Sequence, residues 1–401
     1  MMPEMPDLEA SISTAPELSP DRLAALTSRF VSIKSVNGVD SERDLAVEIA
    51  GELEAYGFES ALVGDPDRPS LGARAGGEPL VVLNGHLDTV PVDDRDEWRF
   101  DPFSGQIEGG AVHGRGACDM KGGLAIQVAV AHWLASLGAA HGLVLHFAMG
   151  EERGEPGTED LLDAGFVAPM GIVLEPTDLQ LGIAQRGLVT LRITITGRAG
   201  HASQPALARN PISVLRSVLS AIDHLDTQPA KSHPLLGRPQ WTPTMIHSGV
   251  IPSMVPGSCV VHVDRRMIPG ETIDGVVATL SSELAQVDTS ADIQVEVAEE
   301  EGIYEPAEVD ADCDTVAHMR QALESQGQEV RIFGTPYSSD VRHLINSAGI
   351  EAVTFGPGRA SELHARDEHI MIEELADAAR VVAAFALRAM GEGGGRPEHR
   401  V

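Results

Sequence analysis

Cysteine is scarce in this chain of 401 residues, and no cysteine has a partner at a recognisable spacing. The three cysteines, Cys118, Cys259 and Cys313, are scattered and odd in number. A disulfide framework is therefore excluded, and so is a C-x-x-C metal or redox motif. This usage favours a reducing compartment.

Positive charge is the second shortage. The chain has 29 Lys and Arg against 60 Asp and Glu, which gives a formal net charge of −31 and a pI near 4.7. Nucleic acid and anionic membranes attract basic surfaces, so neither is expected as a partner. A solvated surface explains the excess of acid, and adaptation to salt is left open as an alternative.

Long apolar runs are also missing, and the segment Met1–Pro20 has no basic-then-apolar pattern of a signal peptide. Apolar residues make up 43% and charged residues 22%, as in globular proteins. We therefore expect a soluble, cytoplasmic protein. A chain of this length is long for a single core, so we expect two domains.

Helices and strands alternate in the first part of the chain. Leu80–Leu83, Leu143–Met149 and Gly171–Leu174 are apolar runs typical of buried strands, and Leu124–Leu137 is typical of a buried helix. This alternation predicts an α/β fold with a mostly parallel sheet flanked by helices.

The pattern changes after Gly182. Leu188–Thr196 alternates apolar and polar residues, and the elements that follow give the order β-α-β-β-α-β of a ferredoxin-like α+β domain. We predict a catalytic domain in two parts, 1–185 and 301–391, with a lid or dimerisation domain at 186–300 inserted between them. The remaining residues, 392–401, are predicted to be a disordered tail.

Acidic residues and histidines follow several predicted strands. His86 and Asp88 leave the strand Leu80–Leu83 on the same side, and Asp119 stands at the mouth of the Ala-rich helix. Similar positions are held by Glu151, Glu152, Glu175 and His364. A capping Asp and a core His would explain the first stretch equally well. Many carboxylates close together repel one another, however, and two divalent cations about 3.5–4 Å apart would relieve that repulsion.

Together these motifs resemble a known family. They include Gly85-His86-Leu87-Asp88-Thr89-Val90, Gly114-Arg115-Gly116, Asp119-Met120-Lys121-Gly122, Glu151-Glu152, Glu175-Pro176-Thr177, Gly197-Arg198-Ala199-Gly200-His201 and Gly356-Pro357-Gly358. From about Asp21 to Met390 the chain resembles the dinuclear zinc metallopeptidases and deacylases. That family includes acetylornithine deacetylase, succinyl-diaminopimelate desuccinylase, aminoacylase and carboxypeptidase G.

The resemblance implies a metal site. Asp119 would bridge two Zn²⁺ ions, with Co²⁺ or Mn²⁺ as substitutes. His86 and Glu175 would complete one site, and Glu152 and His364 the other. Two imidazoles and three carboxylates would leave about one net positive charge on such a pair, which acidifies a bridging water.

The resemblance also implies catalytic roles. Glu151 would be the general base, and Asp88 would orient His86 through its distal N–H. Because neighbouring residues of a strand face opposite ways, Glu151 and Glu152 need an irregular loop to act together. The Asp119–Met120 peptide is expected to be cis.

Further residues would complete the substrate site. By the resemblance, His201 would cross the interface of a homodimer and stabilise the oxyanion in the other active site. Arg266 is interpreted as a clamp for a substrate carboxylate, with a structural ion pair as the alternative. Asn210 suits a helix cap better than a substrate ligand. Gly356 and Gly358 offer a backbone loop for a carboxylate, or ordinary turn chemistry.

The predicted function is hydrolysis of the amide bond of a small N-acyl-amino acid by a hydroxide that bridges the two zinc ions, as in deacetylases and desuccinylases. A dipeptidase or carboxypeptidase, acting on a short peptide, is the alternative. A non-catalytic relative would have lost Glu151 or His364, which are both present. The sequence Gln185-Arg186-Gly187 departs from both the desuccinylase and the acetylornithine enzyme, so the acyl group stays open.

Overall fold

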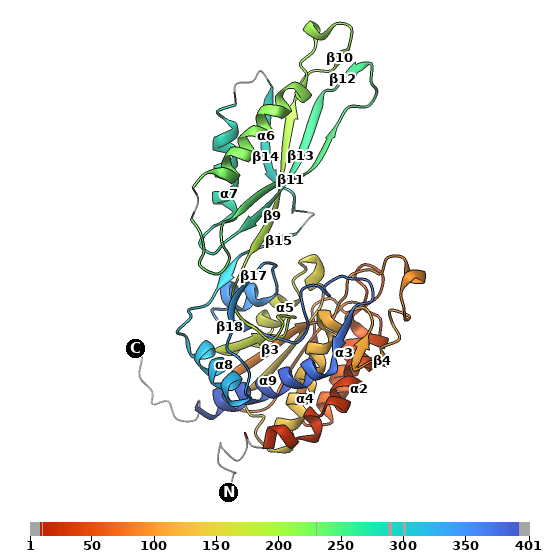
Figure 1. The fold of residues 1–401 in the computed structure, drawn as a ribbon, viewed down its shortest axis with the longest axis vertical. Helices are drawn as coiled ribbons and strands as arrows, with labels where there is room; N and C mark the ends of the chain where they lie inside the picture. Colours follow the sequence, from red (N-terminus) through yellow and green to blue (C-terminus); the bar gives the residue numbers. More distant parts are fainter. Residues whose placement is uncertain (1–8, 10, 230, 288–290, 300–301, 393–401) are drawn as a thin grey trace. The chain divides into compact units, whose positions relative to one another are not determined.

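The computed structural model describes residues 9, 11–229, 231–287, 291–299 and 302–392. It divides into two compact units. The first comprises the described residues up to Ile183, Glu308–Phe333 and those from Ser339 onward, and the second comprises Ala184–Ala307 and Gly334–Ser338. Figure 1 shows the elements of both units, coloured along the chain.

A nine-stranded sheet is the centre of the first unit. Its strands lie in the order β1-β2-β6-β3-β7-β18-β8-β16, and β17 pairs with β8. Their bounds are β1 Glu59–Val63, β2 Ser70–Arg74, β3 Val81–His86, β6 Leu143–Ala148, β7 Met170–Val173, β8 Leu181–Gln185, β16 Ala307–Glu308, β17 Ile332–Thr335 and β18 Glu351–Thr354. The central strands β6, β3, β7 and β18 pair in parallel, whereas β1, β2 and β8 pair antiparallel at the sides. The predicted mostly parallel sheet is confirmed.

Strand β3 is buried along its whole length because both faces of the sheet are covered. Val81 and Leu83 enter one apolar core, and Val82 enters the core on the opposite face. A strand with two covered faces needs apolar residues throughout rather than at alternate positions, which explains the continuous run in the sequence.

Helices form the covering layers (Figure 1). One core includes residues from α2 (Pro20–Ser32), α3 (Arg43–Glu54), α4 (Gly122–Ser136), α8 (Asp314–Ser325) and α9 (Ile372–Glu392). The core on the other face is closed by α5 (Gly157–Asp163) and by a wide turn at His343–Ser347. This turn is of the π type. Helix α4 is buried on all sides, as its Ala- and Val-rich sequence predicts.

A small three-stranded sheet, which the sequence did not predict, lies in the same unit. Its order is β19-β5-β4, from His369–Met371, Ala111–His113 and Gln106–Glu108. This pairing joins the segment before α4 to the segment before α9, so it brings together the loops that carry Asp119 and His364.

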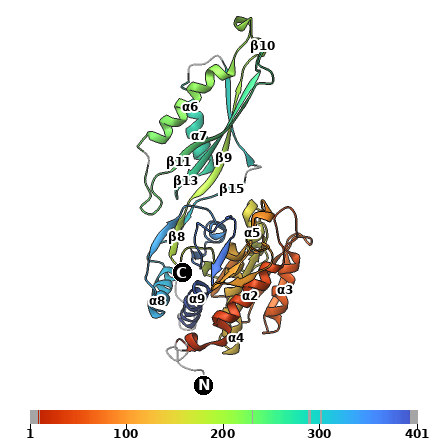
Figure 2. The same cartoon turned by 45° about the vertical axis from the view of Figure 1, so that its right-hand side comes forward.

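The main sheet of the second unit has the predicted ferredoxin-like order. The four long strands β9 (Gly187–Thr196), β11 (Gln240–Ser248), β13 (Ser258–Met267) and β14 (Asp292–Val297) are ordered β11-β13-β9-β14 and are all antiparallel. The short strand β15 (Ile303–Tyr304) also pairs with β9. Helices α6 (Pro211–Thr227) and α7 (Ile273–Leu284) cover one face of this sheet (Figure 2). Alternate residues of β9 point into that core, from Val189 to Ile195.

Our predicted boundaries for the inserted domain were 186–300, and the second unit spans 184–307 with 334–338. The predicted tail at 392–401 lies outside the described residues, apart from residue 392 at the end of α9. None of the helices among the described residues is long and apolar enough to cross a membrane.

Candidate metal centre

His86 is the last residue of β3, and Asp88 follows it by two positions. The His86 Nδ1 atom lies 3.0 Å from the backbone oxygen of Asp88 and 3.5 Å from its carboxylate. With Nδ1–H donating to that carbonyl, Nε2 is left to bind a metal ion. The backbone carbonyl of Asp88 is thus closer to the His86 ring than the carboxylate is, and it is the group that orients the ring.

The Asp88 carboxylate holds the loop after β6. Its two oxygens accept the backbone N–H groups of Glu151 and Glu152, each at 3.1 Å. Those two residues begin a short 3₁₀ turn between Gly150 and Gly154, both of which have positive φ (69° and 65°). This turn is the irregular loop that the adjacent glutamates require, and glycine permits the backbone angles at its ends.

Asp119 lies in a wide turn, Ala117–Lys121, before α4. Its peptide bond to Met120 is cis, as predicted. The buried Glu368 carboxylate accepts the backbone N–H groups of Gly116, Cys118 and Asp119 at 2.9–3.0 Å, and Arg115 Nη1 at 2.7 Å. Glu368 therefore fixes the turn that presents Asp119.

Asp119 belongs to two groups of potential ligands. In each group the ligand atoms lie within 4.8 Å of one another, and the groups are His86–Asp119–Glu175 and Asp119–Glu152–His364. His86 Nε2 is 3.0 Å from Asp119 Oδ1 and 3.7 Å from Glu175. His364 Nε2 is 3.0 Å from Glu152 and 3.5 Å from Asp119 Oδ2. Asp119 offers one oxygen to each group, as a bridging ligand would.

Burial sets the protonation of this cluster. It raises the pKa of Glu151 and Glu175 well above the usual range, and raises that of Glu152. Neighbouring carboxylates add to each shift. Burial alone would lower the pKa of His86, but its contacts to Asp119 and Asp88 raise it overall. The carboxylates of this cluster must therefore be neutralised, either by protons or by bound cations.

Divalent metal ions fit this donor set. Carboxylate oxygens and imidazole nitrogens are ligands of zinc and of similar ions. Two such ions would carry +4 against −3 on Asp119, Glu152 and Glu175, and they would bind the two imidazoles in the neutral form. The predicted metal residues are thus brought together in one place, although their role as ligands stays a prediction.

Comparison with known proteins agrees with this geometry. The model of Peptidase family M20/M25/M40 matches residues 82–388, most of the chain. The chain belongs to this family. It is accordingly a hydrolase of amide bonds, from a family of metallopeptidases, with candidate metal-binding residues in place.

Curated relatives cover nearly the same length. A succinyl-diaminopimelate desuccinylase from Gluconobacter oxydans is 30% identical over 354 residues, which is 84% of this chain and 90% of the relative. An acetylornithine deacetylase from Vibrio atlanticus is 28% identical over 359 residues, 86% of this chain and 92% of the relative.

Solved structures show the same fold. Aminopeptidase PepT from Bacillus cereus has a TM-score of 0.77 at 19% identity, covering 93% of this chain and 99% of that one. A dinuclear metal-binding M20 peptidase from Bacillus subtilis has a TM-score of 0.70 at 16% identity, covering 93% and 98%.

The other predicted side chains belong to the second unit. His201 is exposed, in a two-residue strand that pairs with Met254–Val255. Asn210 is the N-cap of α6, and its side chain accepts the N–H of Ile212 at 3.0 Å. Arg266 makes an ion pair with Asp264 at 3.0 Å. The capping alternative for Asn210 and the ion pair for Arg266 both occur in the structure. Substrate roles for the two residues stay predictions.

The glycine loop lies in the first unit, and its donors are used within the chain. The Gly356 N–H donates to Thr177 Oγ1 at 3.0 Å, and the Gly358 N–H donates to Glu374 at 3.2 Å. A Cβ atom at Gly356 would lie 2.5 Å from the Glu175 backbone oxygen. This glycine therefore allows the loop to pack against the residue that carries a metal-ligand candidate.

Sequence reasoning missed three charged residues beside the cluster. Glu368 is described above, and it lies in the segment that follows His364. Arg342 Nη1 is 3.8 Å from the Glu151 carboxylate and 3.8 Å from the Asp340 carboxylate. Arg342 and Asp340 are both almost fully buried. The charge of Asp340 is the largest influence on the Glu151 pKa after burial. Asp340 lies in a turn and Arg342 at the start of the helical turn that follows, so neither strand nor helix spacing marked the two residues in the sequence.

Proposed function

We propose that this chain is a deacylase that hydrolyses the amide bond of a small N-acyl-amino acid, with two Zn²⁺ ions held by the cluster around Asp119. The observation that carries the proposal is the pair of ligand groups that share Asp119, with Glu151 beside them. The likeness to a desuccinylase and a deacetylase over most of the chain supports the acyl-amino acid as substrate.

Divalent ions at this cluster would polarise the amide carbonyl and acidify a water molecule. His86, Glu175, Glu152 and His364 would hold them, two residues on each side of Asp119. Glu151 would take the proton of the attacking water and deliver it to the leaving nitrogen. Burial raises the pKa of the Glu151 carboxyl, which makes it a stronger base for this proton transfer.

We further propose that His201 stabilises the oxyanion in a homodimer. The Ser203 N–H donates to His201 Nδ1 at 3.1 Å, so the ring proton lies on Nε2. An exposed Nε2–H is a donor suited to a developing negative charge. Mixed dimers of His201→Asn with Glu151→Gln test this arrangement. Recovery of part of the activity supports donation across subunits, and no recovery contradicts it.

A peptidase is the second candidate, because the fold is shared with an aminopeptidase. Its substrate would be a dipeptide or another short peptide, and the machinery would be the same. The three cysteines are without disulfides, which suits the cytoplasm as the site of either activity.

The deciding experiment is a hydrolysis screen of the metal-loaded protein. N-acetyl, N-succinyl and N-formyl amino acids are compared with dipeptides and N-carbamoyl amino acids, with a chelator control. Chelator-sensitive release from one acyl class, lost in Glu151→Gln, supports the proposal. Glu159→Gln is the matched control, since this carboxylate lies on α5 outside the cluster and is half exposed. Hydrolysis of dipeptides alone would replace the deacylase with the peptidase.

A further inference from the structure

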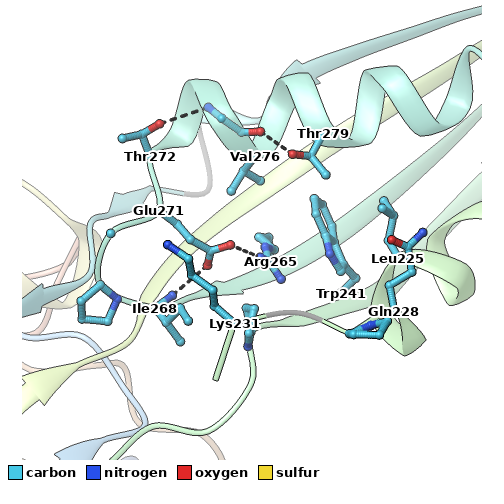
Figure 3. Close-up of a pocket in the computed structure, with 15 residues that line it drawn as sticks. Leu225, Gln228, Lys231, Trp241, Arg265, Ile268, Glu271, Thr272, Val276 and Thr279 are labelled. Atoms are coloured by element: carbon cyan, nitrogen blue, oxygen red, sulfur yellow. Dashed lines mark hydrogen bonds and ion pairs between the residues drawn. The ribbon is translucent and has the colours of Figure 1, made fainter. Parts of the chain in front are cut away.

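A cavity of about 400 Å³ opens within the second unit. Its walls come from the end of α6, the segment before β11, the end of β13 and the first turns of α7 (Figure 3). None of its lining residues belongs to the metal cluster or to the substrate residues predicted above. Its volume suits a small organic ligand.

Arg265 is the charged centre of this cavity. It is only 4% exposed, because strand alternation turns it toward the helices while Arg266 faces the other way. Its guanidinium lies over the Trp241 ring, 4.3 Å from the centroid. Figure 3 shows Arg265 between Trp241 and Glu271.

The Glu271 carboxylate satisfies only part of this guanidinium. Glu271 accepts from Arg265 Nη2, and its other oxygen accepts the N–H of Ile268 at 2.9 Å. Arg265 Nε and Nη1 have no hydrogen-bond partner among the described residues. Buried donors without acceptors are costly, because they have lost water and gained nothing in exchange. A purely structural ion pair with Glu271 therefore leaves two donor atoms unexplained.

The rest of the wall is mainly apolar. It includes Leu225, Pro239, Ile268 and Val276 as well as Trp241. Lys231 adds a second positive charge at the exposed rim, so the cavity has one positive charge in excess of Glu271. This excess stands out on a chain whose formal net charge is −31.

We propose that this cavity binds a small carboxylic acid with an apolar body, whose carboxylate accepts hydrogen bonds from Arg265. The apolar part lies against Trp241 and the prolines, and Lys231 attracts the anion at the entrance. Arginine suits this role because its charge is permanent and its planar group both stacks on an aromatic ring and donates to a carboxylate. The inference is independent of the proposed function, since it rests on residues of the second unit alone.

Titration calorimetry on the full-length protein tests this proposal, with isovalerate and 3-phenylpropionate as probes. The uncharged amides of both acids and inorganic phosphate are the comparison ligands. We expect the acids to bind with one site per chain, and the amides and phosphate to bind at least ~10-fold more weakly, because each lacks the charge or the apolar body.

Three variants locate the site. Arg265→Gln should weaken binding of the acids about 10- to 100-fold, the loss expected for a charge-assisted hydrogen bond. Thr279→Tyr, an exposed position of α7 on the cavity wall, should block entry without touching Arg265. Lys231→Ala should weaken binding several-fold, and more so at low salt. Arg192→Gln, on β9 and paired with Glu296, is the matched control and should bind as the parent does.

The binding of the acids to these variants decides between the proposal and its alternatives. Binding that is lost in both Arg265→Gln and Thr279→Tyr but kept in Arg192→Gln supports the site. Binding of the amides as tightly as the acids would show an apolar cavity without an anion site, which overturns the proposal. Binding that survives in Thr279→Tyr places the acid elsewhere. Absence of binding by either acid at millimolar concentration also refutes it, and Thr279→Tyr keeps the test valid if Arg265→Gln fails to fold.

Discussion

Replacing Glu368 with alanine should destabilise the first unit and loosen the loop that presents Asp119. The Glu368 carboxylate has no exposed surface and accepts four N–H groups, from the Arg115 side chain and from the backbone of the Asp119 turn. Alanine removes all four acceptor contacts. It also leaves the Arg115 guanidinium, 4% exposed, without its counter-ion.

The expected loss is about 3–5 kcal/mol of unfolding free energy, the cost of breaking a buried ion pair by removal of one partner. Much of that cost comes from Arg115, which is left without its counter-ion. The double variant Glu368→Leu with Arg115→Met should therefore lose less unfolding free energy than the single variants Glu368→Leu and Arg115→Met lose together. Metal affinity should fall in Glu368→Ala as well, since Asp119 is held by the same contacts.

Urea unfolding followed by circular dichroism measures this loss. The two units can unfold separately, so the transition that also shifts on addition of metal is assigned to the first unit. Glu108→Ala is the control, because its ion pair with Arg99 is exposed and should change stability by less than about 1 kcal/mol. A change of that small size in Glu368→Ala would refute the reasoning.

Three further predictions concern the same unit. Glu151→Gln should lower kcat about 10²- to 10⁴-fold while metal content measured by atomic absorption stays unchanged, and unaltered kcat would exclude Glu151 as the base. Asp119→Asn should reduce the occupancy of both metal positions, because it contributes an oxygen to each ligand group; loss of only one ion in that assay would contradict a bridging role. Burial lowers the pKa of His146 to about 4 from an ordinary 6.5. The unfolded chain therefore binds the proton first, and ~3 kcal/mol of stability is lost as the pH falls from 6.5 to 4. In urea titrations His146→Gln should lose less stability across that window, and an unchanged pH dependence would rule out His146 as its source.

Strand β3 and helix α4 were predictable because each carries a strong local pattern. A continuous apolar run can be stable only between two covered faces, and a helix that is apolar all round must be buried. The inserted β-α-β-β-α-β unit was predictable for the same reason, since alternation along β9 marks one covered face. These features depend on residues that are close in sequence.

The three-stranded sheet and the buried network around Glu368 were not predictable in this way. Strands β5 and β19 are only three residues long, and their pairing joins segments more than 250 positions apart. Glu368 shows no pattern of its own in the sequence, because its partners are backbone N–H groups of a distant turn. Arg265 stands next to Arg266 in the sequence, and no local pattern shows which of the two is buried. Arg265 is buried because alternation along β13 turns its side chain toward the helices. Which hydrogen-bond acceptors it meets depends on how α7 packs against the sheet.

The position of Glu151 shows how the fold turns local chemistry into a site. On a regular strand Glu151 and Glu152 would point to opposite faces, and only one could reach the cluster. The glycines at positions 150 and 154 let the chain turn sharply, but they do not fix the direction of the turn. The Asp88 carboxylate fixes it, by accepting both N–H groups. Asp88 therefore couples the loop after β3 to the loop after β6. This role of the carboxylate explains why an acidic residue stands two positions after His86. Orientation of the imidazole explains it less well, because the backbone carbonyl of Asp88 lies closer to the ring than the carboxylate does.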